Sequence, residues 1–136
     1  MNSDTKIAVV LREDLPVWKK LNVTAFTISG ISGGTEEIIG EQYEDKSGNI
    51  YLPMITQPIV IYSANQERIK KVHEKALRKY VLFSIFTEEL FLSSTDEECR
   101  EAVKACNSQE LNLVGMAFRS EKRVIDKIVK GLSLHK

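Results

Sequence analysis

Three charged residues follow the first apolar segment of the chain, and their types suit binding or catalysis. After the apolar run that ends at Leu11, the sequence continues with Arg12, Glu13 and Asp14. This place is the carboxyl end of a predicted strand, the edge of an open α/β sheet where ligands bind. Arg12 could hold a carboxylate or phosphate through paired N–H donors, with Asp14 beside it. Asp14 could equally cap the helix that follows, in which Pro16 suits the first turn.

Asn22 is a second candidate, because a helical projection places it among apolar residues. At about 100° per residue, its side of the helix carries Trp18, Ala25, Phe26 and Ser29. The opposite side carries Lys20, Thr24 and Thr27. This pattern predicts that Asn22 lies in the buried stripe. A buried amide needs hydrogen-bond partners, which could be neighbouring backbone groups or a ligand at the floor of a cleft.

Thr87 is a third candidate. It follows another apolar segment, residues 81–86, and precedes Glu88 and Glu89. If that strand neighbours the first, Thr87 would be a hydroxyl at the rim of a cleft shared with Arg12 and Asp14. Otherwise these residues form an ordinary loop.

A basic surface is predicted on the helix over residues 63–79. Most of its cations project to one broad face: Arg68, Lys71, Lys75, Arg78 and Lys79. Such a face is ordinarily solvated, and contact with RNA phosphates is the alternative.

Neither metal binding nor histidine-based catalysis is indicated. His73 lies in the buried stripe of its helix, and His135 lies near the end of the chain. Cys99 and Cys106 are seven residues apart on one predicted helix, which is too far for a disulfide, so both are expected in the core. We therefore expect no metal and no cofactor, and we assign no catalytic residue.

The elements that position these residues alternate between strand and helix. Strands are predicted over residues 6–11, 58–62, 81–86 and 111–118, with a hairpin over 37–54 around the turn at 45–48. Helices are predicted over residues 14–29, 63–79, 95–106 and 120–131. This alternation predicts a three-layer α/β/α domain: a mixed, mainly parallel sheet with helices on both faces.

The composition is that of one ordinary globular domain over residues 1–136. The 19 basic residues balance the 19 acidic ones, so no global field attracts nucleic acid or an anionic membrane. No apolar run approaches the ~18 residues of a membrane helix. The first residues lack the pattern of a signal peptide, so a cytoplasmic location and no membrane partner are expected.

Four segments of the chain resemble a small bacterial family of proteins of unknown function. They are residues 11–18, 21–26, 51–54 and 127–132. That family is similar in fold to peptidyl-tRNA hydrolase type II. The resemblance implies the hydrolase fold, and it alone suggests a homodimer.

The hydrolase's active-site residues are only partly matched. Its opening Lys and Arg-x-Asp-Leu are matched by Lys6, Arg12, Asp14 and Leu15. The positions of its Lys and Gln hold Leu21 and Ala25. A shared fold does not carry activity across, and these two positions speak against hydrolysis.

The sequence therefore predicts a small-ligand-binding domain with no assigned catalysis. The predicted ligand-binding residues are Arg12, Asp14, Asn22 and Thr87. One alternative is a hydrolase acting on an ester or amide, with Asp14 as base or orienting group. The other is RNA binding through the helix face from Arg68 to Lys79.

Overall fold

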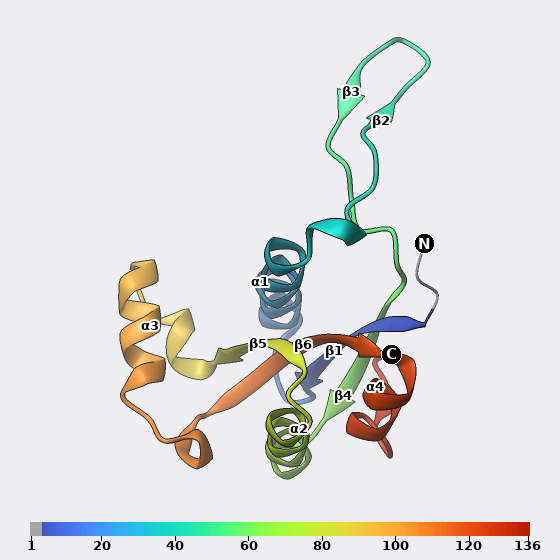
Figure 1. The fold of residues 1–136 in the computed structure, drawn as a ribbon. Coiled ribbons are helices and arrows are strands. Elements are labelled where there is room, and N and C mark those ends of the chain that lie inside the picture. The colour runs from blue at the N-terminus through green and yellow to red at the C-terminus, as the bar shows by residue number, and fades with distance from the viewer. Residues whose placement is uncertain (1–3) are drawn as a thin grey trace.

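A five-stranded mixed sheet forms the centre of the computed structural model, which describes residues 4–136 (Figure 1). Its strands are β1 (Thr5–Arg12), β4 (Ile59–Ala64), β5 (Leu82–Thr87), β6 (Leu113–Glu121) and β7 (Ser133–Leu134). Their order across the sheet is β5-β6-β1-β4-β7.

The sheet is mixed, as predicted, but the expectation of a mainly parallel sheet was wrong. Only β1 and β4 pair in parallel. The pairs β1–β6, β4–β7 and β5–β6 are antiparallel. The reason lies in the connection after β5, where α3 (Asp96–Lys104) and η3 (Ser108–Glu110) stay near one end of the sheet (Figure 1). The chain therefore re-enters the sheet from the end at which it left, and β6 must run the opposite way.

Helices cover both faces of the sheet, as the alternation predicts. The helix α1 (Val17–Gly34) lies on one face, and α2 (Gln66–Arg78) and α4 (Lys122–Ile128) lie on the other (Figure 1). Successive residues of β1 alternate between the two layers, since side chains of a strand point to opposite faces. Val9 packs in the cluster that contains Val23 of α1, and Val10 packs in the cluster that contains Ile69 of α2.

The side of α1 that packs on the sheet differs from the predicted one. Its buried residues are Val23, Thr27 and Ile31. Thr27 was expected on the wet side, but its hydroxyl donates to the Val23 carbonyl at 2.8 Å, which satisfies the hydroxyl inside the core. The helix also continues to Gly34 rather than ending near Ser29. Its Gly30 lies against Ser84 of β5, where a Cβ would come within 3.0 Å of the Ser84 Cβ.

The predicted hairpin is present, but it stands apart from the main sheet. Strands β2 (Tyr43–Glu44) and β3 (Ile50–Tyr51) form a separate two-stranded sheet that projects from the body beyond η1 (Glu36–Ile38) (Figure 1). Asp45 organises its turn by accepting from the backbone N–H groups of Ser47 and Asn49. The Tyr51 hydroxyl and the Asn49 side chain also donate to Asp45 and lower the pKa of its carboxyl to about 2.

Candidate functional site

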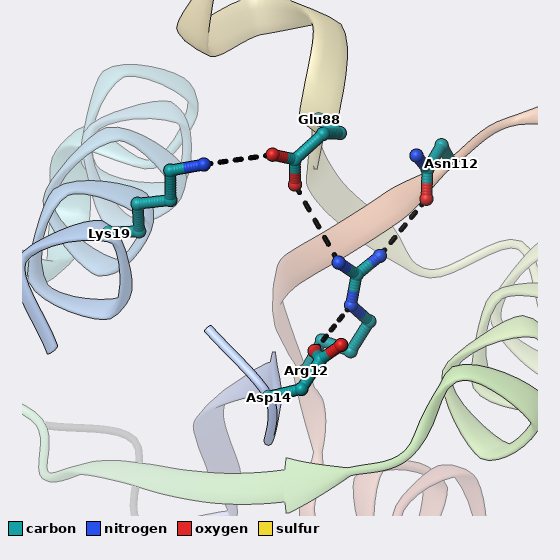
Figure 2. Close-up of polar contacts among 5 residues, drawn as sticks. All are labelled: Arg12, Asp14, Lys19, Glu88 and Asn112. Atoms are coloured by element: carbon teal, nitrogen blue, oxygen red, sulfur yellow. Dashed lines mark hydrogen bonds and ion pairs between the residues drawn. The ribbon is translucent and has the colours of Figure 1, made fainter. Parts of the chain in front are cut away.

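A polar cluster joins four segments at the end of the sheet where β1 and β5 finish and β6 begins. Figure 2 shows the Arg12 guanidinium at its centre. The Nε of Arg12 donates to Asp14 at 2.7 Å, and its Nη1 donates to the Asn112 side chain at 3.0 Å. Its Nη2 lies 3.7 Å from Glu88, the first residue of η2 (Glu88–Phe91). Lys19 of α1 approaches the other oxygen of Glu88 at 2.9 Å.

This cluster is internally balanced rather than open to an external anion. Its two cations face two carboxylates, and the Arg12 side chain is only 13% exposed. Asp14 does not cap α1, whose N-cap is Pro16 without a side-chain hydrogen bond, so the predicted cap was wrong. Pairing with Arg12 takes the place of capping. The cluster therefore holds the end of β1, the start of α1, η2 and the start of β6 together.

Thr87 does not lie at the rim of a cleft. The residue is 1% exposed and ends β5 beneath η2. The backbone N–H of the next residue, Glu88, donates to the Asn112 carbonyl at 3.0 Å. Because β6 lies between β5 and β1, Thr87 does not reach Arg12. The predicted contact between this segment and Arg12 is made instead by the next residue, Glu88.

A pocket of about 480 Å³ lies beside this cluster, between α1, β5, η2 and the start of α3. Four aromatic rings contribute to its walls: Trp18, Phe26, Phe86 and Phe91. The rings of Phe86 and Phe91 are 4.9 Å apart, and the pairs Trp18–Phe91 and Phe26–Phe86 are each 5.8 Å apart. Lys19 links pocket and cluster, since its Nζ lies 4.5 Å from the centre of the Phe91 ring.

Asn22 lies in this pocket and not in the core. The residue is exposed and lines the pocket between Trp18 and Phe26, one helical turn from each. Among residues 4–136, its side chain makes no hydrogen bond. The prediction of a buried Asn22 was wrong because the apolar stripe around it faces the pocket. The core side of α1 is the one that carries Thr27.

The polar side of the pocket comes from the segment that enters α3. Thr95 caps this helix by accepting from the Glu98 N–H at 3.1 Å, as its spacing predicts. Asp96 lines the pocket and is paired with Arg100. Cys99 also lines the pocket, whereas Cys106 packs against the core beneath α2. Both cysteines are free and partly exposed, so the prediction of two core thiols was wrong for Cys99.

The other titratable candidates lie elsewhere. His73 is 6% exposed on the opposite face of the sheet, edge-on to Phe83, and burial lowers its pKa below the ordinary value. Within residues 4–136, no group of three His, Cys, Asp or Glu side chains could hold a metal ion. None of the helices in that part of the chain is both long enough and apolar enough to cross a membrane.

A smaller pocket of about 220 Å³ lies between α2 and the segment after α4. Four cations line it: Arg68, Lys71, Lys75 and Lys130. Arg68 donates to the Gly131 carbonyl. In the part of the chain that the structure describes, none of the four forms an ion pair, and no carboxylate lines the pocket.

Several residues of the site have no strong signal in the sequence. Asn112 belongs to the cluster because β6 runs beside β1, which brings residue 112 next to residue 12. Lys19 belongs to it because η2 brings Glu88 next to α1. Phe91 could have been noticed in the sequence only as an aromatic residue shortly after Glu88 and Glu89, in a segment too short for a full helix.

Comparisons with known proteins place the chain among proteins of unknown function. A family described as "Protein of unknown function (DUF2000)" matches residues 5–136. The solved structure of Atu0240, a protein of unknown function from Agrobacterium tumefaciens strain C58, is 45% identical in sequence. That alignment covers 99% of this chain and 100% of the other, with a TM-score of 0.96. A comparison with curated proteins gave no match.

Proposed function

The chain belongs to the DUF2000 family of proteins of unknown function, and we propose that it is a ligand-binding domain whose site is the aromatic pocket between α1, β5 and η2. The observation that carries this proposal is Asn22. Its amide has no partner among residues 4–136, and it stands between Trp18 and Phe26 in the wall of the pocket. An apolar pocket with few convergent polar groups is the usual form of a small-molecule site.

The pocket fits a neutral ligand with a flat apolar ring and one amide, carbonyl or hydroxyl group. Its volume of about 480 Å³ is within the range of small-molecule sites. Stacked or edge-on contacts with the four rings favour an aromatic ligand. Among residues 4–136, no cation lines the pocket, and the one carboxylate that does, Asp96, is paired with Arg100. Asn22 offers one acceptor and two donors to the polar group.

The proposal can be tested with two naphthalene probes, because Trp18 is the only tryptophan in the chain. We expect 2-naphthamide to change Trp18 fluorescence saturably. Asn22→Leu should weaken that binding by roughly five- to tenfold, the equivalent of ~1–1.5 kcal/mol for one hydrogen bond. Binding of 2-ethylnaphthalene, which lacks the amide, should not weaken. Calorimetry gives an independent affinity.

Ser29→Ala is the matched control, since Ser29 lies on the same side of α1 but outside the pocket. It should leave both affinities unchanged. The proposal fails if neither probe binds saturably, or if Asn22→Leu weakens both probes equally.

The pairing of Asp14 argues for binding without hydrolysis. A hydrolase needs a base within reach of water or a nucleophile. Asp14 is paired with Arg12 and does not line the pocket. Leu21 and Ala25, at the positions of the hydrolase's Lys and Gln, supply no proton-transfer group. The peptidyl-tRNA hydrolase-like fold and a cytoplasmic location stay predictions.

Binding of RNA phosphates is a second candidate function, favoured by the four cations of the smaller pocket, which form no ion pair with any of residues 4–136. Lys71→Glu with Lys75→Glu should weaken tRNA binding more than tenfold in a filter assay at about 50 mM salt, and wild-type affinity should fall steeply by about 200 mM. A second charge-reversal pair, Lys46→Glu with Lys104→Glu, lies outside this pocket and should have a smaller effect. Equal losses in both variants, or no wild-type binding at low salt, would exclude this candidate.

A further inference from the structure

The projecting hairpin carries several large apolar side chains that are exposed. We call residues 39–55 the arm; it is closed at its base by the Ile39–Ile55 bridge. In Figure 1 the arm extends away from the sheet and the helices. Five of its apolar side chains are each more than half exposed: Tyr43, Ile50, Tyr51, Leu52 and Met54.

These side chains cannot all be covered by the chain that carries them. Ile50 and Tyr51 are neighbours in β3, so they point to opposite sides of the strand. Folding the arm back onto the body would cover only one of those sides. A two-stranded hairpin alone is marginally stable in water, and its open edges pair readily with other chains. The arm therefore has the properties of a segment that packs against another molecule.

The extended position of the arm is shared with a solved structure. The arm is 17 of the 136 residues, about one-eighth of the chain. The TM-score with the Agrobacterium protein is 0.96 over 99% of this chain. The score would be lower if one-eighth of the residues had a different position in that protein. The arm projects in both proteins.

We propose that the arm docks on a second copy of this chain, forming a two-fold homodimer. The chain carries both halves of such an interface. Helix α1 leads directly through η1 into the arm, and residues 21–35 contain no charged residue. On its outer side, Val17 and Leu21 are 71% and 67% exposed. In a two-fold arrangement, the arm of each copy packs on α1 of the other.

Charge favours a second copy over other occupants. The formal net charge of the chain is zero, so two copies do not repel one another. Glu41, Glu44 and Asp45 lie among the apolar residues of the arm and disfavour an anionic membrane or a nucleic acid. Val17 and Leu21 do not line the aromatic pocket, so this proposal and the proposed function rest on different residues.

Sedimentation velocity of the full chain tests this proposal over a range of concentrations. Wild-type protein should sediment with the mass of two chains. The variant Ile50→Ser with Leu52→Ser should sediment as one chain, with a dimer dissociation constant raised at least 100-fold. Leu21→Glu, on the helix that receives the arm, should have the same effect. Glu41→Gln with Glu44→Gln, which changes only acidic residues of the same arm, should stay dimeric.

Two outcomes would overturn the proposal. One is a wild-type protein that sediments as a single chain at about 100 µM, whether or not it then binds phosphatidylcholine vesicles through the arm. The other is a dimer that survives the Ile50→Ser and Leu52→Ser changes. Circular dichroism separates loss of the dimer from loss of the fold, because the arm is not part of either core cluster beyond its base.

Discussion

Gly115→Ala is expected to destabilise the protein by about 1–3 kcal/mol, the usual cost of overfilling a packed core. Gly115 lies in the middle of β6, directly beneath α1. A Cβ at this position would come within 2.3 Å of a methyl group of Val23 and within 3.3 Å of the Val10 carbonyl. The backbone of β6 cannot move away, because it pairs with β1 on one side and with β5 on the other. Urea unfolding followed by circular dichroism measures the change.

A double-mutant cycle with Val23→Ala identifies the cause. Val23→Ala alone leaves a cavity and lowers the free energy of unfolding, but it removes the methyl group that a new Cβ would meet. Gly115→Ala should therefore cost less in the Val23→Ala background, with a favourable coupling of about 1 kcal/mol. Gly33→Ala is the control, since a Cβ there meets nothing within 4 Å and should be neutral or stabilising. Additive effects of the two substitutions would contradict this account.

This packing explains which parts of the fold the sequence could predict. The apolar segment at 6–11 and the helix pattern at 63–79 correspond to β1 and α2. Both could be predicted because their apolar residues are the ones that are buried. The orientation of α1 could not be predicted in this way. Its core side contains Thr27 and Gly30, which allow a close approach to β5 and β6, whereas its aromatic residues face the pocket.

The direction of β6 could not be predicted from the sequence pattern either. An apolar strand after a helix suggests a parallel crossover, but α3 does not cross the sheet. The same strand runs on to Glu121, so the last helix begins at Lys122 and not at the predicted residue 120. The consequence for the site is direct, because the antiparallel β6 places Asn112 beside Arg12. Of the predicted site residues, Asn22 alone lines the pocket, although the reasoning that selected it assumed burial.

Replacement of Arg12 by methionine is expected to lower the free energy of unfolding by about 2–3 kcal/mol. It is also expected to weaken ligand binding in the aromatic pocket, although Arg12 does not line that pocket. The substitution removes the contacts with Asp14, Asn112 and Glu88 together. One Glu88 oxygen is buried and accepts no hydrogen bond among residues 4–136, and it faces Arg12 at 3.7 Å, so the substitution removes the cation next to it. The loss should be smaller than for a fully buried pair, because the Glu88 and Asp14 side chains are 33% and 67% exposed and water screens them.

The comparison with Asp14→Asn separates the contacts of Arg12. That variant changes only the most exposed partner and should cost less than ~1 kcal/mol in urea unfolding. Equal losses for Arg12→Met and Asp14→Asn would mean that the contacts with Glu88 and Asn112 contribute nothing. The effect on the pocket follows from the positions of Lys19 and Glu88, which connect the helix bearing Trp18 to the segment bearing Phe91. Arg12→Met should therefore weaken 2-naphthamide binding and speed amide hydrogen exchange in residues 88–91.

The same substitution also decides whether Arg12 holds an anion. If Arg12 served an external carboxylate or phosphate, inorganic phosphate or acetate would raise the melting temperature of the wild-type protein and not that of Arg12→Met. The existing contacts argue for the opposite result, because each nitrogen of the guanidinium already faces an oxygen of Asp14, Asn112 or Glu88. An incoming anion would have to displace one of these partners and leave it without its cation. We therefore expect neither anion to distinguish the two proteins, and Arg12 to support the pocket by joining β1, η2 and β6 at its edge.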